Sequence, residues 1–240
     1  MTNHRSVKLT DSLYCYIWQG MGNNCNTCVF SDVLERDRPH IIVDPGHVAN
    51  EMDEDCLGSL EEAMAGDEIK IEDTGLIINT HCHPDHCEAN DLVIEKSGAR
   101  VTMSKEEDEF RTTIGKVMFS MFGMKPPGFT PAYFLKEGIF SPGNNAFKLE
   151  IMLTPGHSPG SVCLYVPDKK VLITGDVIFF MSVGRTDFPG GDIQLLRNSI
   201  QRLSRLDTEY LVPGHNTEPN GVIRGRDQIK RNFQAIEMYF

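Results

Sequence analysis

The chain has 240 residues and carries 23 Lys and Arg against 34 Asp and Glu, which gives a formal net charge of −11. Because this charge repels polyphosphates, we expect no nucleic-acid partner. Hydrophobic residues make up 40% of the chain and charged residues 24%, which is typical of a globular protein and excludes a disordered or fibrous one. The most apolar run, residues 177–183, is far below the roughly 18 residues that a membrane helix needs, so we expect no membrane partner.

Alternating apolar residues and short apolar runs predict strands, and apolar residues at helical spacing predict helices. The strands are expected, in chain order, at residues 8–18, 24–30, 40–43, 76–79, 147–153, 162–166, 171–174 and 210–212. Helices are expected around residues 57–64, 193–203 and 229–236. No internal repeat or low-complexity linker divides the chain, so we expect a single domain over residues 1–240.

Residues 104–146 fit neither pattern. They begin with an acidic run and continue with the Met- and Phe-rich residues 117–124 and the sequence KPPGFTP. Long excursions of this kind often cover active sites. We therefore expect a lid-like insertion, helical or irregular, whose apolar run closes the site or joins two copies in a homo-oligomer.

Seven cysteines, in a chain whose first residues lack the apolar core of an export signal, favour free thiols over a disulfide framework. We therefore expect a cytoplasmic protein. Cys25 and Cys28 have the spacing of a metal-binding or redox pair. Without a second such pair this signal is weak, and we expect the two cysteines to be thiols of the core.

Ligand-type side chains follow four of the expected strands, and loops held by a rigid sheet commonly carry function. In chain order they are His81, His83, Asp85, His86, His157, Asp176 and His215. One histidine at a strand end is more often a satisfied polar group than a metal ligand, but four independent loops reverse that balance. Imidazole and carboxylate suit zinc, iron and manganese, and seven such groups are enough for two divalent ions that share an aspartate.

The run His81-Cys82-His83-Pro84-Asp85-His86 resembles the HxHxDH signature of the metallo-β-lactamase fold superfamily, and the family's later ligand positions also match. The resemblance covers nearly the whole chain. It implies an α/β fold, an αββα sandwich in which two mixed sheets lie face to face with helices on both outer faces.

The same resemblance implies how the ligands divide between the two metal ions. The first ion would be held by His81, His83 and His157, the second by Asp85, His86 and His215, with Asp176 as a bridge. Asp44 would support the ligands from behind. Zinc is expected ahead of iron or manganese.

Residues 154–161 and 184–192 are similar to those of short glyoxalase II-like proteins, which hydrolyse S-acyl glutathione thioesters. This resemblance implies a thioesterase that cleaves a small molecule such as S-lactoylglutathione by attack of a metal-bridging hydroxide. Asp85 would be catalytic, holding the hydroxide in line as well as ligating. Arg185 and Asp187 are assigned to structure beneath the site.

The nearest alternative is an oxidoreductase of the persulfide dioxygenase type. Such enzymes share the Gly-Arg-Thr-Asp-Phe run of residues 184–188 and hold one iron at the equivalents of His81, His157 and Asp176. Ser182-Val183 stands here where that subfamily usually has a cysteine, which favours the hydrolase. A phosphodiesterase or nuclease is disfavoured by the net charge, a lactonase of the same fold is a weaker alternative, and β-lactam hydrolysis is not favoured because those enzymes usually replace ligands that are intact here.

Overall fold

The computed structural model describes residues 2–34, 37–142, 147–216 and 221–240. Its first large sheet has the strand order β1-β2-β3-β4-β5-β6-β7. The strands are His4–Lys8, Leu13–Trp18, Thr27–Phe30, His40–Val43, Thr74–Ile78, Arg100–Ser104 and Tyr133–Leu135. The pairs from β1 to β4 are antiparallel and those from β4 to β7 are parallel.

The second large sheet has the strand order β15-β14-β11-β10-β9-β8. These strands are Ile223–Arg224, Tyr210–Pro213, Val171–Gly175, Val162–Val166, Leu149–Leu153 and Gly138–Phe140. Strands β11 and β14 are parallel, and the other pairs are antiparallel. A small separate hairpin joins β12 (Ile178–Phe179) to β13 (Ser182–Val183).

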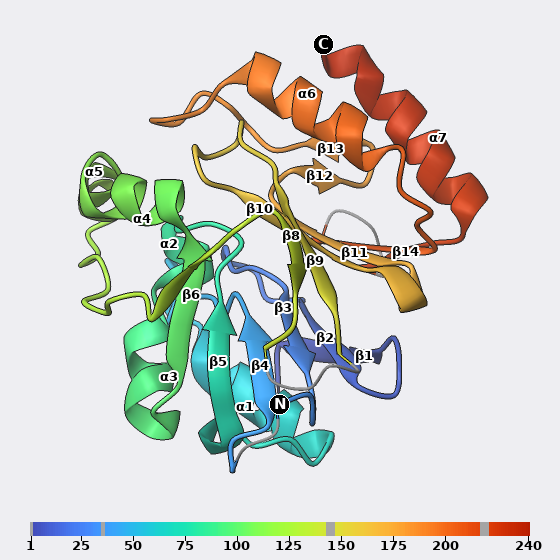
Figure 1. Cartoon of the computed structure of the whole chain (residues 1–240). Helices are drawn as coiled ribbons and strands as arrows, with labels where there is room; N and C mark the ends of the chain where they lie inside the picture. The colour runs from blue at the N-terminus through green and yellow to red at the C-terminus, as the bar shows by residue number, and fades with distance from the viewer. Residues whose placement is uncertain (1, 35–36, 143–146, 217–220) are drawn as a thin grey trace.

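Helices cover the outer face of each sheet (Figure 1). Helices α1 (Cys56–Gly66) and α3 (Asn90–Ser97) lie against the first sheet, and α6 (Ile193–Leu203) and α7 (Arg226–Ile236) lie against the second. The shorter helices are α2 (Pro84–Cys87), α4 (Lys105–Thr112) and α5 (Gly115–Met121), with 3-10 turns at Ile71–Asp73, Pro167–Lys169 and Glu237–Tyr239. The expected αββα sandwich is confirmed.

Three apolar layers hold the sandwich together. Between the sheets, Ile41 and Ile78 of the first sheet pack with Ile151 and Leu164 of the second. Because successive side chains of a strand point to opposite faces, the neighbouring Ile42 faces the outer helices instead. The central strands are therefore apolar on both faces, which is why they read as continuous apolar runs.

The structure differs from the predicted elements at several places. Helix α3 and strand β6 lie where the sequence pattern predicted no element. Residues 8–18 form two strands joined by a turn, because Leu9 and Thr10 both donate backbone hydrogen bonds to the carbonyl of Leu13. Strand β3 begins at Thr27 rather than at residue 24, because the Asn26 backbone nitrogen donates to Gly214 outside the sheet. The insertion contains two short edge strands, β7 in the first sheet and β8 in the second, each too short to show a period.

Helices α1, α4 and α6 begin at side-chain caps. Asp192, the expected cap of α6, accepts hydrogen bonds from the backbone nitrogens of Gln194 and Leu195. Ser104 caps α4 in the same way through Glu107. Among the described residues, no helix has both the length and the apolar character needed to span a bilayer.

Candidate metal centre

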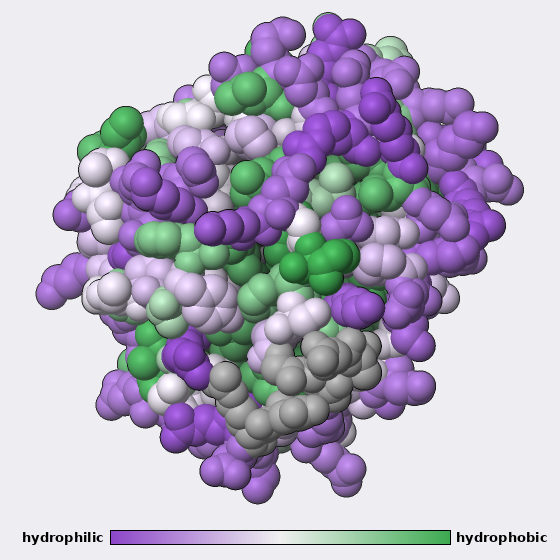
Figure 2. Space-filling view, viewed as in Figure 1, coloured by the Kyte–Doolittle hydropathy of each residue, from purple (hydrophilic) through white to green (hydrophobic). Residues whose placement is uncertain are grey.

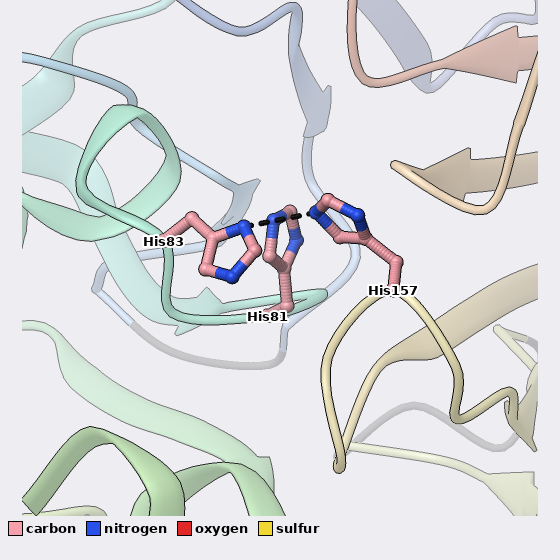
Figure 3. Close-up of side chains that lie close together, drawn as sticks. All are labelled: His81, His83 and His157. Atoms are coloured by element: carbon pink, nitrogen blue, oxygen red, sulfur yellow. Dashed lines mark hydrogen bonds between the residues drawn. The ribbon is translucent and has the colours of Figure 1, made fainter. Parts of the chain in front are cut away.

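Histidines from two loops form the first ligand group. His81 and His83 follow β5, and His157 follows β9; their ligand atoms all lie within 4.8 Å of one another. Figure 3 shows the three rings converging on one point, with Nδ1 of His83 2.9 Å from Nε2 of His157. Two nitrogens bound to one tetrahedral zinc ion lie about 3.3 Å apart. The first group therefore has nearly the spacing that an ion requires.

The second ligand group contains Asp85, His86 and His215, whose ligand atoms also lie within 4.8 Å of one another. Nε2 of His215 is 3.4 Å from Nε2 of His86 and 3.2 Å from Oδ2 of Asp85. Asp85 and His86 lie on α2, which begins at Pro84 directly after His83. The segment from His81 to His86 thus supplies residues to both groups.

Asp176 lies between the two groups. Its Oδ1 is 3.2 Å from Nε2 of His86, and its Oδ2 is 3.3 Å from Nε2 of His215 and 3.5 Å from Nε2 of His157. Strand β11 ends at Gly175, so this carboxylate comes from the second sheet while the helical turn of α2 comes from the first. The carboxylate touches a histidine of each group, which is the position of a shared ligand.

The donor set fits divalent metal ions. Nε2 of His81 is buried and has no hydrogen-bond partner among the described residues. A buried polar atom without a partner costs free energy, and a bound cation would remove that cost. Five imidazoles and two carboxylates suit ions of intermediate softness such as zinc, iron and manganese.

Hydrogen bonds fix which nitrogen two of the histidines present. Nδ1 of His157 donates to the carbonyl of Arg185 at 2.7 Å, and Nδ1 of His215 donates to the carbonyl of Asn24 at 3.1 Å. A carbonyl only accepts, so in both rings Nε2 is left as the ligand atom when the ring is neutral. The orientation of these ligands is therefore set by the loops around them.

Asp44 supports the site from beneath, at the end of β4. Its Oδ1 accepts from the backbone nitrogen of Thr80, and its Oδ2 accepts from the Thr80 hydroxyl at 2.6 Å and from Nδ1 of His86 at 2.9 Å. Both oxygens are thus occupied, so Asp44 orients a ligand rather than serving as one. Its φ of 52° lies in the left-handed region, which is uncommon outside glycine and often occurs at functional sites.

The two ligand groups differ in their electrostatics. Burial lowers the pKa of His83 to about 3, so its imidazole is neutral and ready to bind a cation. Burial also lowers the pKa of His215, but the carboxylates of Asp176 and Asp85 outweigh it and raise this pKa to about 10. A metal ion bound by His215 must therefore displace a proton, which couples metal affinity to pH.

Glu107, which the sequence analysis did not single out, joins the two loops of the first group. Its buried carboxylate accepts from the backbone nitrogen of Cys82 at 2.8 Å, from the hydroxyl of Ser158 at 2.7 Å and from the backbone nitrogen of Gly160 at 3.0 Å. Cys82 lies between His81 and His83, and Ser158 follows His157. Glu107 belongs to the acidic run at the start of the insertion. Such a run usually forms the solvent-exposed face of a helix, so it did not indicate a buried carboxylate.

Asn23 is a second residue that the sequence analysis missed. Its side-chain nitrogen donates to Oδ2 of Asp85 at 2.9 Å, and its backbone nitrogen donates to Glu51 at 2.7 Å. Asn23 lines the cavity over the metal centre. It therefore holds one carboxylate oxygen of Asp85 from the solvent side.

The expectation for Arg185 and Asp187 needs correction. Their side chains do not lie beneath the site but pair with each other at its mouth, with 58% and 66% of their surface exposed. The Arg185 guanidinium lies 3.9 Å from the centre of the Phe188 ring, which holds it above the ligands. The part of Arg185 that supports the site is its backbone carbonyl, which accepts a hydrogen bond from Nδ1 of the candidate ligand His157.

Cys25 and Cys28 are free thiols of the core, as expected, but their sulfurs have different partners. Cys25 and Cys28 are both buried, but Cys28 faces Cys15 of the neighbouring strand, with their sulfurs 2.7 Å apart. Cys25 instead donates to the carbonyl of Asp44 at 3.5 Å. The two thiols therefore belong to different contacts.

Comparisons with known proteins place the chain in a family. A family model described as the metallo-beta-lactamase superfamily matches residues 29–215. The chain is 37% identical over 186 residues to the Probable metallo-hydrolase MJ0888 of Methanocaldococcus jannaschii, covering 74% of this chain and 83% of that protein. It is 32% identical over 180 residues to Hydroxyacylglutathione hydrolase GloC of Haemophilus influenzae, covering 73% of this chain and 79% of that protein.

Solved structures agree with this placement. A metallo-beta-lactamase family protein from Thermus thermophilus superposes with a TM-score of 0.74 at 18% identity, over 97% of this chain and 80% of that one, which shows the shared fold. A protein named TTHA1623, solved in a di-iron-bound form, superposes with a TM-score of 0.63 at 25% identity, over 82% of this chain and 92% of that one.

Proposed function

Because the chain belongs to the metallo-β-lactamase superfamily, we propose that it is a dinuclear metal-dependent hydrolase that cleaves thioesters such as S-lactoylglutathione. The observation that carries the proposal is the position of Asp176, whose carboxylate touches His157 of one ligand group and both His86 and His215 of the other. One carboxylate shared by two groups favours a pair of ions over a single one.

The reaction is hydrolysis of a carbon–sulfur bond. Two divalent ions, held by the two ligand groups with Asp176 between them, would lower the pKa of water to about 7 and so supply hydroxide near neutral pH, and they would polarise the acyl carbonyl. Water adds to the acyl carbon, the carbon–sulfur bond breaks, and the products are a carboxylic acid and a thiol. A thiolate leaves readily, so the site needs no strong general acid.

The chain's own residues orient this reaction. Asp85 lines the cavity beside His215, and its carboxylate can accept a proton from the attacking water. Asn23 restrains Oδ2 of that carboxylate through a hydrogen bond of 2.9 Å. Asp44 and Glu107 act further back: Asp44 orients His86, and Glu107 fixes the spacing of the loops that carry His81, His83 and His157.

Relatives support the hydrolase over the oxidoreductase. One relative named for hydroxyacylglutathione hydrolysis is 32% identical across most of this chain. A single-iron oxidoreductase would need only His81, His157 and Asp176, whereas this chain also brings Asp85, His86 and His215 within 4.8 Å of one another. One similar protein of known structure was solved in a di-iron-bound form. Iron is therefore an alternative to zinc as the metal of this centre.

Asp176→Asn tests the proposal, because it keeps the shape of the side chain and removes its charge. We expect the metal-loaded variant to lose at least about a hundredfold in kcat/KM for S-lactoylglutathione and to bind fewer than two ions per chain. Asp168→Asn, an exposed aspartate away from the cavity, is the matched control. Wild-type activity in Asp176→Asn, or a wild type that binds two ions and cleaves no thioester, would overturn the proposal.

A further inference from the structure

The residues that line the cavity over the metal centre form two sets of opposite character, which we name the polar wall and the apolar wall. The volume of the cavity is about 880 Å³, far more than a lactoyl group occupies. The polar wall contains Asn23, His47, Asn50 and Glu51. The apolar wall contains Met118, Phe122, Met124, Phe179, Val183 and Phe188. Five of the candidate metal ligands, His83, Asp85, His157, Asp176 and His215, line the same cavity.

The end of α5 builds the centre of the apolar wall. Met118 is buried and, with Phe119, anchors the helix, while Phe122 directly after the helix is 54% exposed. The chain turns at Gly123, whose φ is 70°, and the Met124 backbone nitrogen donates back to Phe119 at 2.8 Å. This turn presents Phe122 and Met124 to the cavity. Methionine side chains are flexible and polarisable, which suits a wall that packs against chains of varied shape.

Hydrophobic side chains are also exposed on the surface around α5. This region lies at the upper left of Figure 2. An apolar side chain that remains in water can lower the free energy by meeting an apolar ligand. Phe122 lies at the cavity, whereas Met121, 67% exposed on the same helix, does not line it.

Charge on the cavity walls argues against a polyanionic ligand on the apolar side. Among the described lining residues, Arg185 is the one Lys or Arg, and its guanidinium is bound by Asp187 at 2.7 Å and 2.6 Å. The polar wall carries the carboxylate of Glu51, which suits an amide or an ammonium group. The apolar wall thus offers no unpaired cation among the described residues to a second carboxylate or a phosphate.

We propose that the apolar wall receives the acyl chain of the substrate and that the polar wall faces its thiol carrier. The enzyme then prefers thioesters of apolar acyl groups of medium length over short or hydroxylated ones. This inference rests on the thioesterase activity proposed above and names the substrate class of the same site.

A series of thioesters tests the preference in the metal-loaded protein. One small neutral carrier, N-acetylcysteamine, is acylated with acetyl, lactoyl, butanoyl and octanoyl groups. Each methylene that leaves water contributes about fourfold, so we expect kcat/KM to rise at least about tenfold from butanoyl to octanoyl. A flat series, or one in which lactoyl exceeds octanoyl, would overturn the inference.

Two variants of the α5 region locate the effect. Phe122→Ala is expected to lower the octanoyl-to-acetyl ratio of kcat/KM at least about fivefold. Met121→Ala, which removes an exposed side chain of similar size outside the cavity, should leave the ratio unchanged. Equal ratios in both variants and the wild type would show that the chain binds elsewhere.

A binding measurement separates failure of this inference from failure of the proposed function. Ketone analogues in which a methylene separates the carbonyl from the sulfur cannot be hydrolysed, and calorimetry gives their dissociation constants. Tighter binding of the octyl than of the methyl analogue, lost in Phe122→Ala, supports the acyl-chain site even if no thioester is cleaved. Equal binding of the two analogues beside measurable thioesterase activity overturns the inference alone. If long alkyl groups on the thiol side give the gain in kcat/KM instead, the assignment of the two walls is wrong.

Discussion

Oδ2 of Asp44 lies 2.9 Å from Nδ1 of His86, so a carboxylate outside the ligand set fixes the orientation of a ligand inside it. In Asp44→Asn the side-chain NH₂ group can take the place of Oδ2, and it cannot accept the hydrogen bond from Nδ1 of His86. We expect zinc affinity of the second group to fall about 10- to 100-fold. Competition with a chromophoric chelator measures this affinity. Asp53→Asn is a matched control, because Asp53 has nearly the same φ, 55°, and is exposed; an equal loss in both variants would contradict the role of Asp44.

Glu107→Gln tests the link between the two loops of the first group. The amide keeps one oxygen, so it can accept from Cys82 or from Ser158 and Gly160, but not from both sides as the carboxylate does. We expect the free energy of unfolding to fall by about 1 to 3 kcal/mol and the metal content to fall with it. Urea unfolding and elemental analysis check both effects. Glu106→Gln on the exposed face of the same helix should change neither quantity.

Gly184→Ala tests how closely the backbone approaches the ligands. A β-carbon at this position would overlap the carbonyl oxygen of Asp176 and lie 3.1 Å from Nδ1 of His157. Because backbone cannot give way as a flexible side chain does, we expect a loss of about 3 kcal/mol in unfolding free energy and a distorted metal site. Gly66→Ala, with nothing within 4 Å of the added carbon, should be neutral or stabilising. Thermal melts compare the two, and equal melting temperatures would contradict the packing described.

The sequence predicted the candidate ligands that the structure brings together, but not the residues that support them. The candidate ligands are His and Asp residues that follow predicted strands. Their identity and approximate position can therefore be predicted from the sequence alone. Glu107 and Asn23 act through hydrogen bonds that cross between loops, and no local pattern marks such contacts. Strands β7 and β8 are only three residues long, which is too short for an alternating pattern to predict them. They form because they pair with the edge of a sheet. The side chain of Arg185 was misplaced because stacking on Phe188 decides its direction.

His4 gives a pH dependence that is separate from the metal ligands. Its ring is buried against Trp18, and Nδ1 lies 3.0 Å from the hydroxyl of Ser59. Burial lowers its pKa to about 4, below the value of about 6.5 in the unfolded chain. The unfolded chain therefore binds more protons between these values, so the stability that His4 contributes is present above pH 6.5 and is lost as the pH falls towards 4.

Unfolding by urea at pH 7 and pH 5 measures this contribution. We expect the wild type to lose about 2 kcal/mol more than His4→Gln between the two pH values. Both proteins share all other titrating groups, so the difference between their changes in unfolding free energy with pH reports on His4 alone. A wild-type slope equal to that of the variant would show that His4 is not buried in its neutral form.

We propose that seven side chains from four loops hold two metal ions that hydrolyse a thioester. Elemental analysis of the purified wild type, made on the same preparation as an assay with S-lactoylglutathione and octanoyl-N-acetylcysteamine, tests it most directly. We expect two divalent ions per chain, zinc ahead of iron or manganese, and release of free thiol from at least one of these substrates. One iron per chain, with oxygen consumed in the presence of a persulfide and no thiol released, would contradict it.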